Sequence, residues 1–150
     1  MKIDTILVPT DFSQDAERAL EVATYLAAEF GSRIVLLHAY HIDFPHTSPG
    51  FTAPVILPDG FYVQCQNEAT LRVEALAKET AAKGVEATGV AVERPPSLGI
   101  LDQIEALPAD LVVMGTRGLT GLKHVALGST AERVVRSATC PVLTVKSDRD

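Results

Sequence analysis

The chain has 150 residues, of which 47% are hydrophobic and 21% are charged, a composition typical of a globular protein rather than a disordered one. This length is most simply that of one domain over residues 1–150. The formal net charge of -6 argues against broad nucleic-acid binding, because such binding requires a basic surface. No apolar run approaches the roughly 20 residues that a membrane-spanning helix needs. We therefore expect no nucleic acid and no membrane as partners.

The N-terminal residues and the two cysteines both bear on the cellular location of the protein. The N-terminal residues enter a strand pattern at once, which leaves no room for a signal peptide and favours a cytoplasmic location. Cys65 and Cys140 lie far apart and show no CxxC spacing. We therefore expect free thiols in a reducing compartment rather than a disulfide or a zinc site.

The first third of the chain predicts a strand, a helix and a second strand. Residues 3–8 form an apolar run, and the helical pattern that follows has Ser13 as its N-cap and Gly31 as its stop. Residues 34–37 are continuously apolar, as in a strand that is covered on both faces. The next segment, from residue 41 to about residue 60, has no clear period and is interpreted as a lid, a binding loop or a disordered excursion.

The remaining sequence continues the alternation of helices and strands. Helices are expected over residues 63–83, from Pro95-Pro96-Ser97 through Ile104, and over residues 129–137; strands are expected over residues 85–92, 111–114 and 141–145. This order predicts a Rossmann-like, doubly wound α/β fold, with a five-stranded parallel sheet and helices on both faces. Ligands of such sheets bind beyond the carboxyl ends of the strands, where Asp11, Ala39 and Gly115 follow their strands.

A glycine cluster marks the junction between the fourth strand and the last helix. Residues 112–118 read VVMGTRG, and Gly128-Ser129-Thr130 follows at the start of the helical pattern. Unpaired backbone N–H groups and the helix dipole favour an anion at such a junction. We expect glycine here because it permits close approach of the backbone and a positive φ. The spacing is neither that of a P-loop nor GxGxxG, so the pattern indicates another kind of phosphate site.

Four pieces of the sequence, in order, carry a family resemblance. They are ILVPTDFS at residues 6–13, LLHA at 36–39, the pattern Gly115-x-x-Gly118-(nine residues)-Gly128-Ser129, and CPVLTV at 140–145. With these pieces the chain resembles the universal stress protein family over almost its whole length. In that family the glycine pattern marks the branch that binds ATP.

The resemblance implies a site for ATP with Mg²⁺ or Mn²⁺, and a homodimer. Residues 141–145 are apolar enough to pair with their copy across a two-fold axis. It implies that the residues after the first two strands surround adenine and ribose, and that the glycine loop and the last helix meet ribose and phosphates. The expected binding residues are Pro9, Thr10, Asp11, Ala39, Met114, Gly115, Arg117, Gly118, Gly128, Ser129 and Thr130. We assign no catalytic residue and no metal ligand of the protein.

Structural alternatives exist for several of these residues. Ser129 and Glu132 have the spacing of a capping box, and Asp11 fits a turn or helix start. Arg117 is either a phosphate ligand or an exposed loop arginine. Lys123 and His124 are typical of solvated loop residues, and His38 is typical of a hydrogen-bonded, partly buried histidine.

The function that these features favour is an adenine-nucleotide-responsive stress or signalling module that acts on an unidentified protein partner. The sequence offers no evident residue to orient a water molecule for attack on the γ-phosphate. Two alternatives stay open: a slow ATP hydrolase or phosphotransferase, and a dimeric adaptor that binds no nucleotide. The preference among ATP, ADP and AMP is also open.

Overall fold

A five-stranded parallel sheet with the strand order β3-β2-β1-β4-β5 forms the centre of the protein. The computed structural model describes residues 2–42, 56–119 and 127–146. The strands are β1 (Thr5–Pro9), β2 (Arg33–Tyr40), β3 (Ala87–Glu93), β4 (Leu111–Gly115) and β5 (Val142–Val145). The helices are α1 (Gln14–Phe30), α2 (Phe61–Ala81), α3 (Pro96–Ala106) and α4 (Ser129–Ser137). The predicted doubly wound α/β fold is confirmed.

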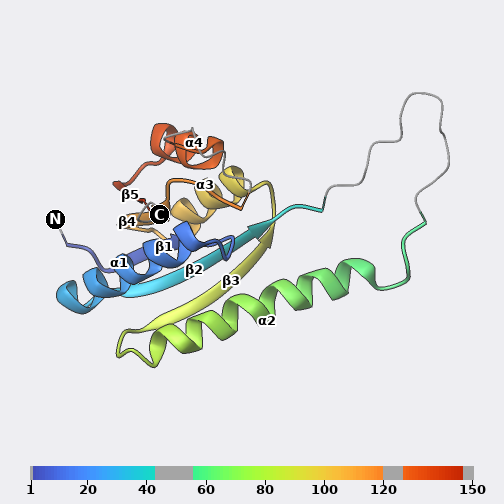
Figure 1. Cartoon of the computed structure of the whole chain (residues 1–150), viewed down its shortest axis with the longest axis horizontal. Helices are drawn as coiled ribbons and strands as arrows, with labels where there is room; N and C mark the ends of the chain where they lie inside the picture. Colours follow the sequence, from blue (N-terminus) through green and yellow to red (C-terminus); the bar gives the residue numbers. More distant parts are fainter. Residues whose placement is uncertain (1, 43–55, 120–126, 147–150) are drawn as a thin grey trace.

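The helices cover both faces of the sheet, with α1 and α2 on one side and α3 and α4 on the other (Figure 1). Successive side chains of a strand point to opposite faces, so each strand contributes to two cores. In β1, Ile6 and Val8 pack with α1 and α2, whereas Leu7 packs with α3 and α4. This double burial explains why the strands read as continuous apolar runs.

Local signals at the ends of α1 act as predicted. The hydroxyl oxygen of Ser13 accepts a hydrogen bond from the backbone N–H of Ala16 at 3.3 Å. At the other end, Gly31 has a φ of 67°, the left-handed conformation that glycine adopts without steric cost. The sequence therefore fixes both ends of the helix that connects β1 to β2.

The second strand is longer than its apolar run. It continues to Tyr40 because parallel pairing with β3 extends through Ala39↔Val92 and Tyr40↔Glu93, beyond the predicted end at residue 37. Backbone pairing thus carries the strand past the point where both faces are covered. The predicted irregular segment falls largely on residues 43–55, which lie outside the described residues.

The sheet has its topological switch point between β1 and β4. The chain leaves β1 through α1 on one face and leaves β4 through α4 on the other, so the two loops diverge above neighbouring strands. A crevice is expected at this place in doubly wound sheets. Across residues 2–42, 56–119 and 127–146, no helix has both the length and the hydropathy needed to cross a membrane.

Gly89 allows α2 to lie directly on β3. A Cβ atom at this position would lie 2.7 Å from the carbonyl oxygen of Val73 and 3.0 Å from the backbone nitrogen of Glu74, so the helix would have to move. We expect Gly89→Ala to lower the free energy of unfolding by about 1–3 kcal/mol, measured by urea denaturation. Thr88→Val, at the exposed neighbouring position, is the control; equal stability of the two variants would contradict the explanation.

Candidate functional site

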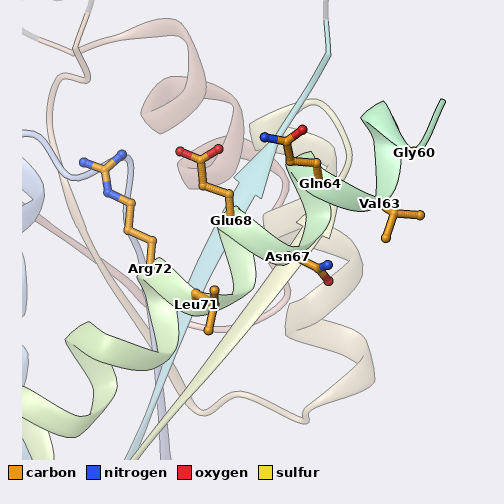
Figure 2. Close-up of a pocket in the computed structure, with 7 residues that line it drawn as sticks. All are labelled: Gly60, Val63, Gln64, Asn67, Glu68, Leu71 and Arg72. Atoms are coloured by element: carbon orange, nitrogen blue, oxygen red, sulfur yellow. The ribbon is translucent and has the colours of Figure 1, made fainter. Parts of the chain in front are cut away.

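Among the described residues, two hollows are of a size that could hold a small molecule. The larger of the two, about 890 Å³, lies along the first half of α2 (Figure 2). The described residues that border it belong to α2 or to its N-cap Gly60. Small-molecule sites usually bring polar groups together from several elements, whereas these bordering residues come from one helix. None of the predicted site residues lies there.

The second hollow is a cavity of about 570 Å³ at the carboxyl ends of β1, β2 and β4. This volume falls within the range of about 300–1,000 Å³ that is usual for small-molecule sites. The predicted binding residues that line it are Pro9, Thr10, Asp11, Ala39, Met114, Gly115, Arg117, Gly118, Gly128, Ser129 and Thr130. All eleven thus share one cavity, while their contact with a ligand stays a prediction.

The lining of this cavity differs between its elements. The contributions of β2 and α3 are apolar: Leu37, Ala39, Pro96 and Ile100. Helix α3 comes close to β2 because it carries Gly99, where a Cβ atom would lie 2.9 Å from the Cβ of Ala39. The loops after β1 and β4 and the start of α4 contribute most of the polar and charged groups. The cavity therefore offers surfaces for both an apolar and an anionic part of one ligand.

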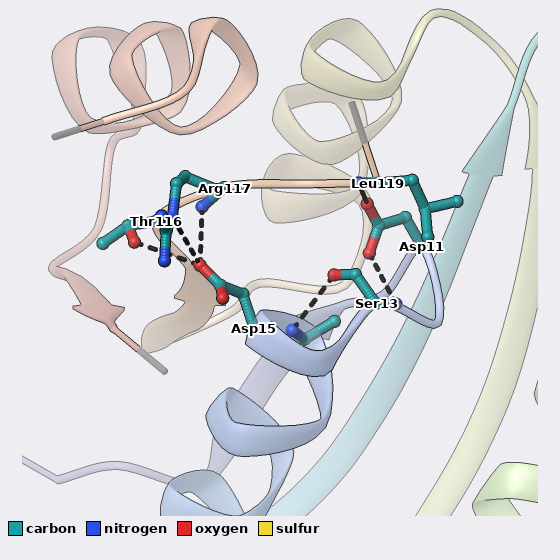
Figure 3. A network of polar contacts seen from close by, with 7 residues as sticks. Asp11, Ser13, Asp15, Thr116, Arg117 and Leu119 are labelled. Carbon is teal, nitrogen blue, oxygen red and sulfur yellow. Dashed lines mark hydrogen bonds and ion pairs between the residues drawn. The ribbon is translucent and has the colours of Figure 1, made fainter. Parts of the chain in front are cut away.

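Asp11 connects the loop after β1 with the loop after β4. Its Oδ1 accepts a hydrogen bond from the backbone N–H of Ser13 at 3.0 Å, as the turn interpretation predicts. Its Oδ2 accepts a second one from the backbone N–H of Leu119 at 2.9 Å (Figure 3). The carboxylate thus stabilises its own turn and also holds a segment more than 100 residues further along the chain.

The expectation of positive φ in the glycine cluster is wrong. Among the described glycines, those with positive φ are Gly31, Gly60 and Gly84. In the cluster, close approach explains the glycines instead: a Cβ atom at Gly118 would lie 2.5 Å from Asp11 Oδ2. At Gly115 it would lie 2.8 Å from the Cβ of Asp15. Gly118 therefore makes room for the carboxylate of Asp11, and Gly115 makes room for the first turn of α1 at Asp15.

The start of α4 differs from the predicted capping box. Gly128 is the N-cap and Ser129 is the first helical residue, so no side chain of the described residues caps this end. The Gly128 N–H donates to the carbonyl oxygen of Thr116 at 2.7 Å, and Glu132 pairs with Arg136 at 2.6 Å. The first N–H groups of a helix have no partner within the helix, and these lie at the cavity wall. N–H groups in this position are suited to binding an anion.

Asp15 is a residue of this region that the sequence analysis missed. Its side chain is buried, and its Oδ2 accepts hydrogen bonds from the Thr116 hydroxyl at 3.2 Å and from the Arg117 backbone N–H at 3.2 Å. The Arg117 Nε lies 3.4 Å from the same oxygen. Arg117 is 24% exposed, so its interpretation as an exposed loop residue is wrong. The sequence gives no signal of these contacts, because an acid in the first turn of a helix is common and its partners here lie about 100 residues away.

The side chain of His38 supports the loop after β1 from outside the cavity. It is partly buried, and its Nδ1 lies 2.9 Å from the carbonyl oxygen of Thr10, to which it donates a hydrogen bond. Its ring centroid lies 4.8 Å from that of Phe12. The interpretation of a hydrogen-bonded, partly buried histidine is confirmed. Lys123 and His124 lie outside the described residues.

The described residues offer little for a metal or a disulfide. Cys65 and Cys140 are both free thiols, as predicted, and burial raises the pKa of Cys140 above its ordinary value. Within the part of the chain that the structure describes, no group of three or more His, Cys, Asp or Glu side chains could hold a metal ion.

Comparisons with known proteins agree with this architecture. A sequence model described as the universal stress protein family matches residues 2–146. Universal stress protein YxiE of Bacillus subtilis is 34% identical over 145 residues, which cover 94% of this chain and 97% of that protein. The solved structure of MJ0577, a protein of Methanocaldococcus jannaschii, covers all of both chains with a TM-score of 0.81 and 25% identity.

Two further solved structures share the fold at 22% identity. One is a universal stress protein in complex with cAMP, which has a TM-score of 0.69 and covers 99% of this chain and 100% of that one. The other is the universal stress protein from Archaeoglobus fulgidus in complex with dAMP, which has a TM-score of 0.63 and covers 97% of this chain and 100% of that one.

Gly118 provides a test of the contact between the two loops. A methyl group there would collide with Asp11 Oδ2, so we expect Gly118→Ala to break the hydrogen bond from Leu119. Amide hydrogen exchange measured by NMR should then show faster exchange at Leu119, while the core strands keep their protection. Unchanged protection of Leu119 would contradict the role of this contact.

Proposed function

Because the chain belongs to the universal stress protein family, we propose that it binds ATP in the cavity of about 570 Å³ and acts as a nucleotide-responsive stress-signalling module. One observation carries the proposal. The cavity combines an apolar wall from β2 and α3 with the uncapped N-terminus of α4. These are the surfaces that an adenine ring and a phosphate chain require.

Each part of ATP has a suitable surface in the proposed binding mode. Adenine lies against the apolar wall with Ala39 and Met114, and ribose lies near Asp11. The phosphates bind the N–H groups at the start of α4 and the side chains of Ser129 and Thr130. The complexes of two relatives with cAMP and dAMP support an adenine nucleotide as the ligand class.

A divalent cation, Mg²⁺ or Mn²⁺, accompanies the triphosphate in this proposal. The charged side chains among the described residues that border the cavity are Asp11, Arg117 and Glu132, two acids and one base. One arginine does not offset the charge of a triphosphate, so a cation on the phosphates would make binding more favourable. Mg²⁺ is commonly held by phosphate oxygens, water and few protein groups, which fits this cavity.

The geometry supports binding more than rapid turnover. Hydrolysis needs a group that orients the attacking water. Both oxygens of Asp11 already accept backbone hydrogen bonds, and Glu132 is engaged by Arg136. We propose that the protein acts in the cytoplasm. At a hundredfold excess of ATP over Kd, binding stabilises by about 2.7 kcal/mol the conformation in which the loops after β1 and β4 enclose the nucleotide. A protein partner then recognises the surface of these ordered loops.

Calorimetric titration tests the binding proposal. We expect ATP with Mg²⁺ to bind the purified protein, and Gly118→Val to weaken binding by about tenfold or more, because the displaced loop no longer meets the phosphates. Thr88→Val, far from the cavity, should bind as the parent does. Heating freshly purified protein should also release an adenine nucleotide, identified by absorbance and mass.

Two outcomes of these measurements would favour the alternatives. If ATP gave no binding heat and heating released no nucleotide, the results would favour the alternative of a dimeric adaptor that binds no nucleotide. Steady release of phosphate from ATP, lost in Asp11→Asn while binding persists, would favour the slow hydrolase.

We also propose that the protein is a homodimer that pairs through β5. This strand is at the edge of the sheet, and Leu143 in it is 38% exposed. An edge strand with exposed apolar side chains is suited to pairing with a second copy. Sedimentation analysis should give the mass of a dimer for the parent and a larger monomer fraction for Leu143→Arg; a monomeric parent would contradict the proposal.

A further inference from the structure

Asp15 contacts the loop after β4 without lining the cavity. It lies in the first turn of α1, is 7% exposed and is absent from the described residues that border the cavity. Its Oδ2 accepts from the Thr116 hydroxyl, from the Arg117 backbone N–H and from Arg117 Nε, at 3.2, 3.2 and 3.4 Å. One buried oxygen thus meets three donors from two consecutive loop residues.

The burial of Asp15 makes this arrangement stiff. A buried carboxylate is costly unless hydrogen bonds and an opposite charge compensate it. Among the described residues, Thr116 and Arg117 provide both kinds of compensation, so a loop that moved away would take these hydrogen bonds and this charge from the carboxylate. Thr116 is itself 2% exposed, and Gly115 lets the end of β4 approach the Asp15 backbone closely. The contact therefore holds the loop in one conformation.

Two carboxylates hold the loop on either side of Gly118. Asp15 accepts the N–H of Arg117, and Asp11 accepts the N–H of Leu119 (Figure 3). Both of these amides are turned toward the start of α1. Arg117 borders the cavity together with the start of α4. The hydrogen bond from its Nε to Asp15 orients its side chain.

We propose that Asp15 is a positioning residue for the phosphate chain: it acts through Thr116 and Arg117 to order the phosphate-binding loop before the nucleotide arrives. This inference rests on the proposed function, since it concerns the same cavity. Ordering a loop in advance removes an entropic cost of binding. The effect of Asp15 falls mainly on ligands with phosphates, because Arg117 borders the cavity together with the start of α4, where the phosphates are proposed to bind, whereas adenine is proposed to lie against the apolar wall of β2 and α3.

A matched control separates this role from a simple effect of charge on the helix. Asp15 and Glu17 are both acids in the first turn of α1, where negative charge stabilises the helix dipole. Glu17 is exposed, whereas Asp15 is buried against the loop. Asp15→Asn and Glu17→Gln remove one charge from the same turn, and Asp15→Ala also removes the hydrogen-bond acceptor.

The experiment compares ATP with adenosine by calorimetry for the parent and the three variants. We expect Asp15→Ala to weaken ATP binding by about tenfold or more, and the ATP affinity of Asp15→Asn to lie between those of the parent and Asp15→Ala. The adenosine affinity of both variants should stay within about twofold of that of the parent. Glu17→Gln should leave both affinities unchanged. An equal loss for ATP and adenosine, or no loss for either, would overturn the proposal. If Asp15→Ala does not fold, Asp15→Asn gives the same comparison.

A second measurement needs no nucleotide and keeps the two proposals distinguishable. Amide hydrogen exchange of the nucleotide-free protein should become faster at Arg117 and Gly118 in Asp15→Asn and stay unchanged in Glu17→Gln. Equal exchange in the parent and in Asp15→Asn would overturn the positioning role. A parent that binds neither ATP nor adenosine would instead contradict the proposed function, while the exchange data still decide whether Asp15 orders the loop.

Discussion

The candidate site depends on the parallel pairing of β1 with β4. Ile6 pairs with Leu111 and Leu7 with Val112, which brings two distant parts of the chain into neighbouring positions. The loops that follow these strands then diverge to opposite faces of the sheet, and the cavity lies where they part. Every further contact of the site, from Asp11 to Leu119 or from Asp15 to Arg117, requires this pairing first.

Space at the junction of the two loops is the second constraint. Gly115 and Gly118 have no side chains, and the Cβ and backbone of Asp15 and the carboxylate of Asp11 occupy the room that a Cβ atom would need. The glycine pattern thus reflects contacts inside the protein as much as contacts with a ligand. This accounts for a site whose loop is held by hydrogen bonds before any ligand binds. For the same reason, a side chain at Gly118 would disturb the loop while leaving the sheet intact.

Much of the architecture follows from the sequence because it rests on local signals. Apolar runs covered on both faces identify the strands, and Ser13 and Gly31 identify the ends of α1. The rule that ligands bind at the carboxyl ends of parallel strands, with the family resemblance, leads to residues that share one cavity. These inferences need no knowledge of which distant side chains meet.

Prediction from the sequence fails where a residue's role depends on contacts with distant parts of the chain. Asp15 reads as an ordinary acid in a first helical turn, and its contacts with Thr116 and Arg117 follow from the packing of α1 against the end of β4. The spacing of Ser129 and Glu132 predicts a capping box, yet the Gly128 N–H bonds to Thr116 and the helix begins at Ser129. A partner outside the helix decides the position of its first turn. Local capping rules take no account of such a partner.

The two helix starts near the cavity differ in their capping and charge, and this difference gives the proposed nucleotide a preferred direction. The start of α1 is satisfied internally, because Ser13 caps it and Asp11 and Asp15 place negative charge beside it. At the start of α4, no described side chain makes a capping hydrogen bond, and Glu132, the acid in its first turn, is paired with Arg136. Phosphates are repelled by the carboxylates of the first helix and attracted to the N–H groups of the other. In the proposed binding mode, the phosphate chain therefore points toward α4, which leaves the apolar wall of β2 and α3 for the base.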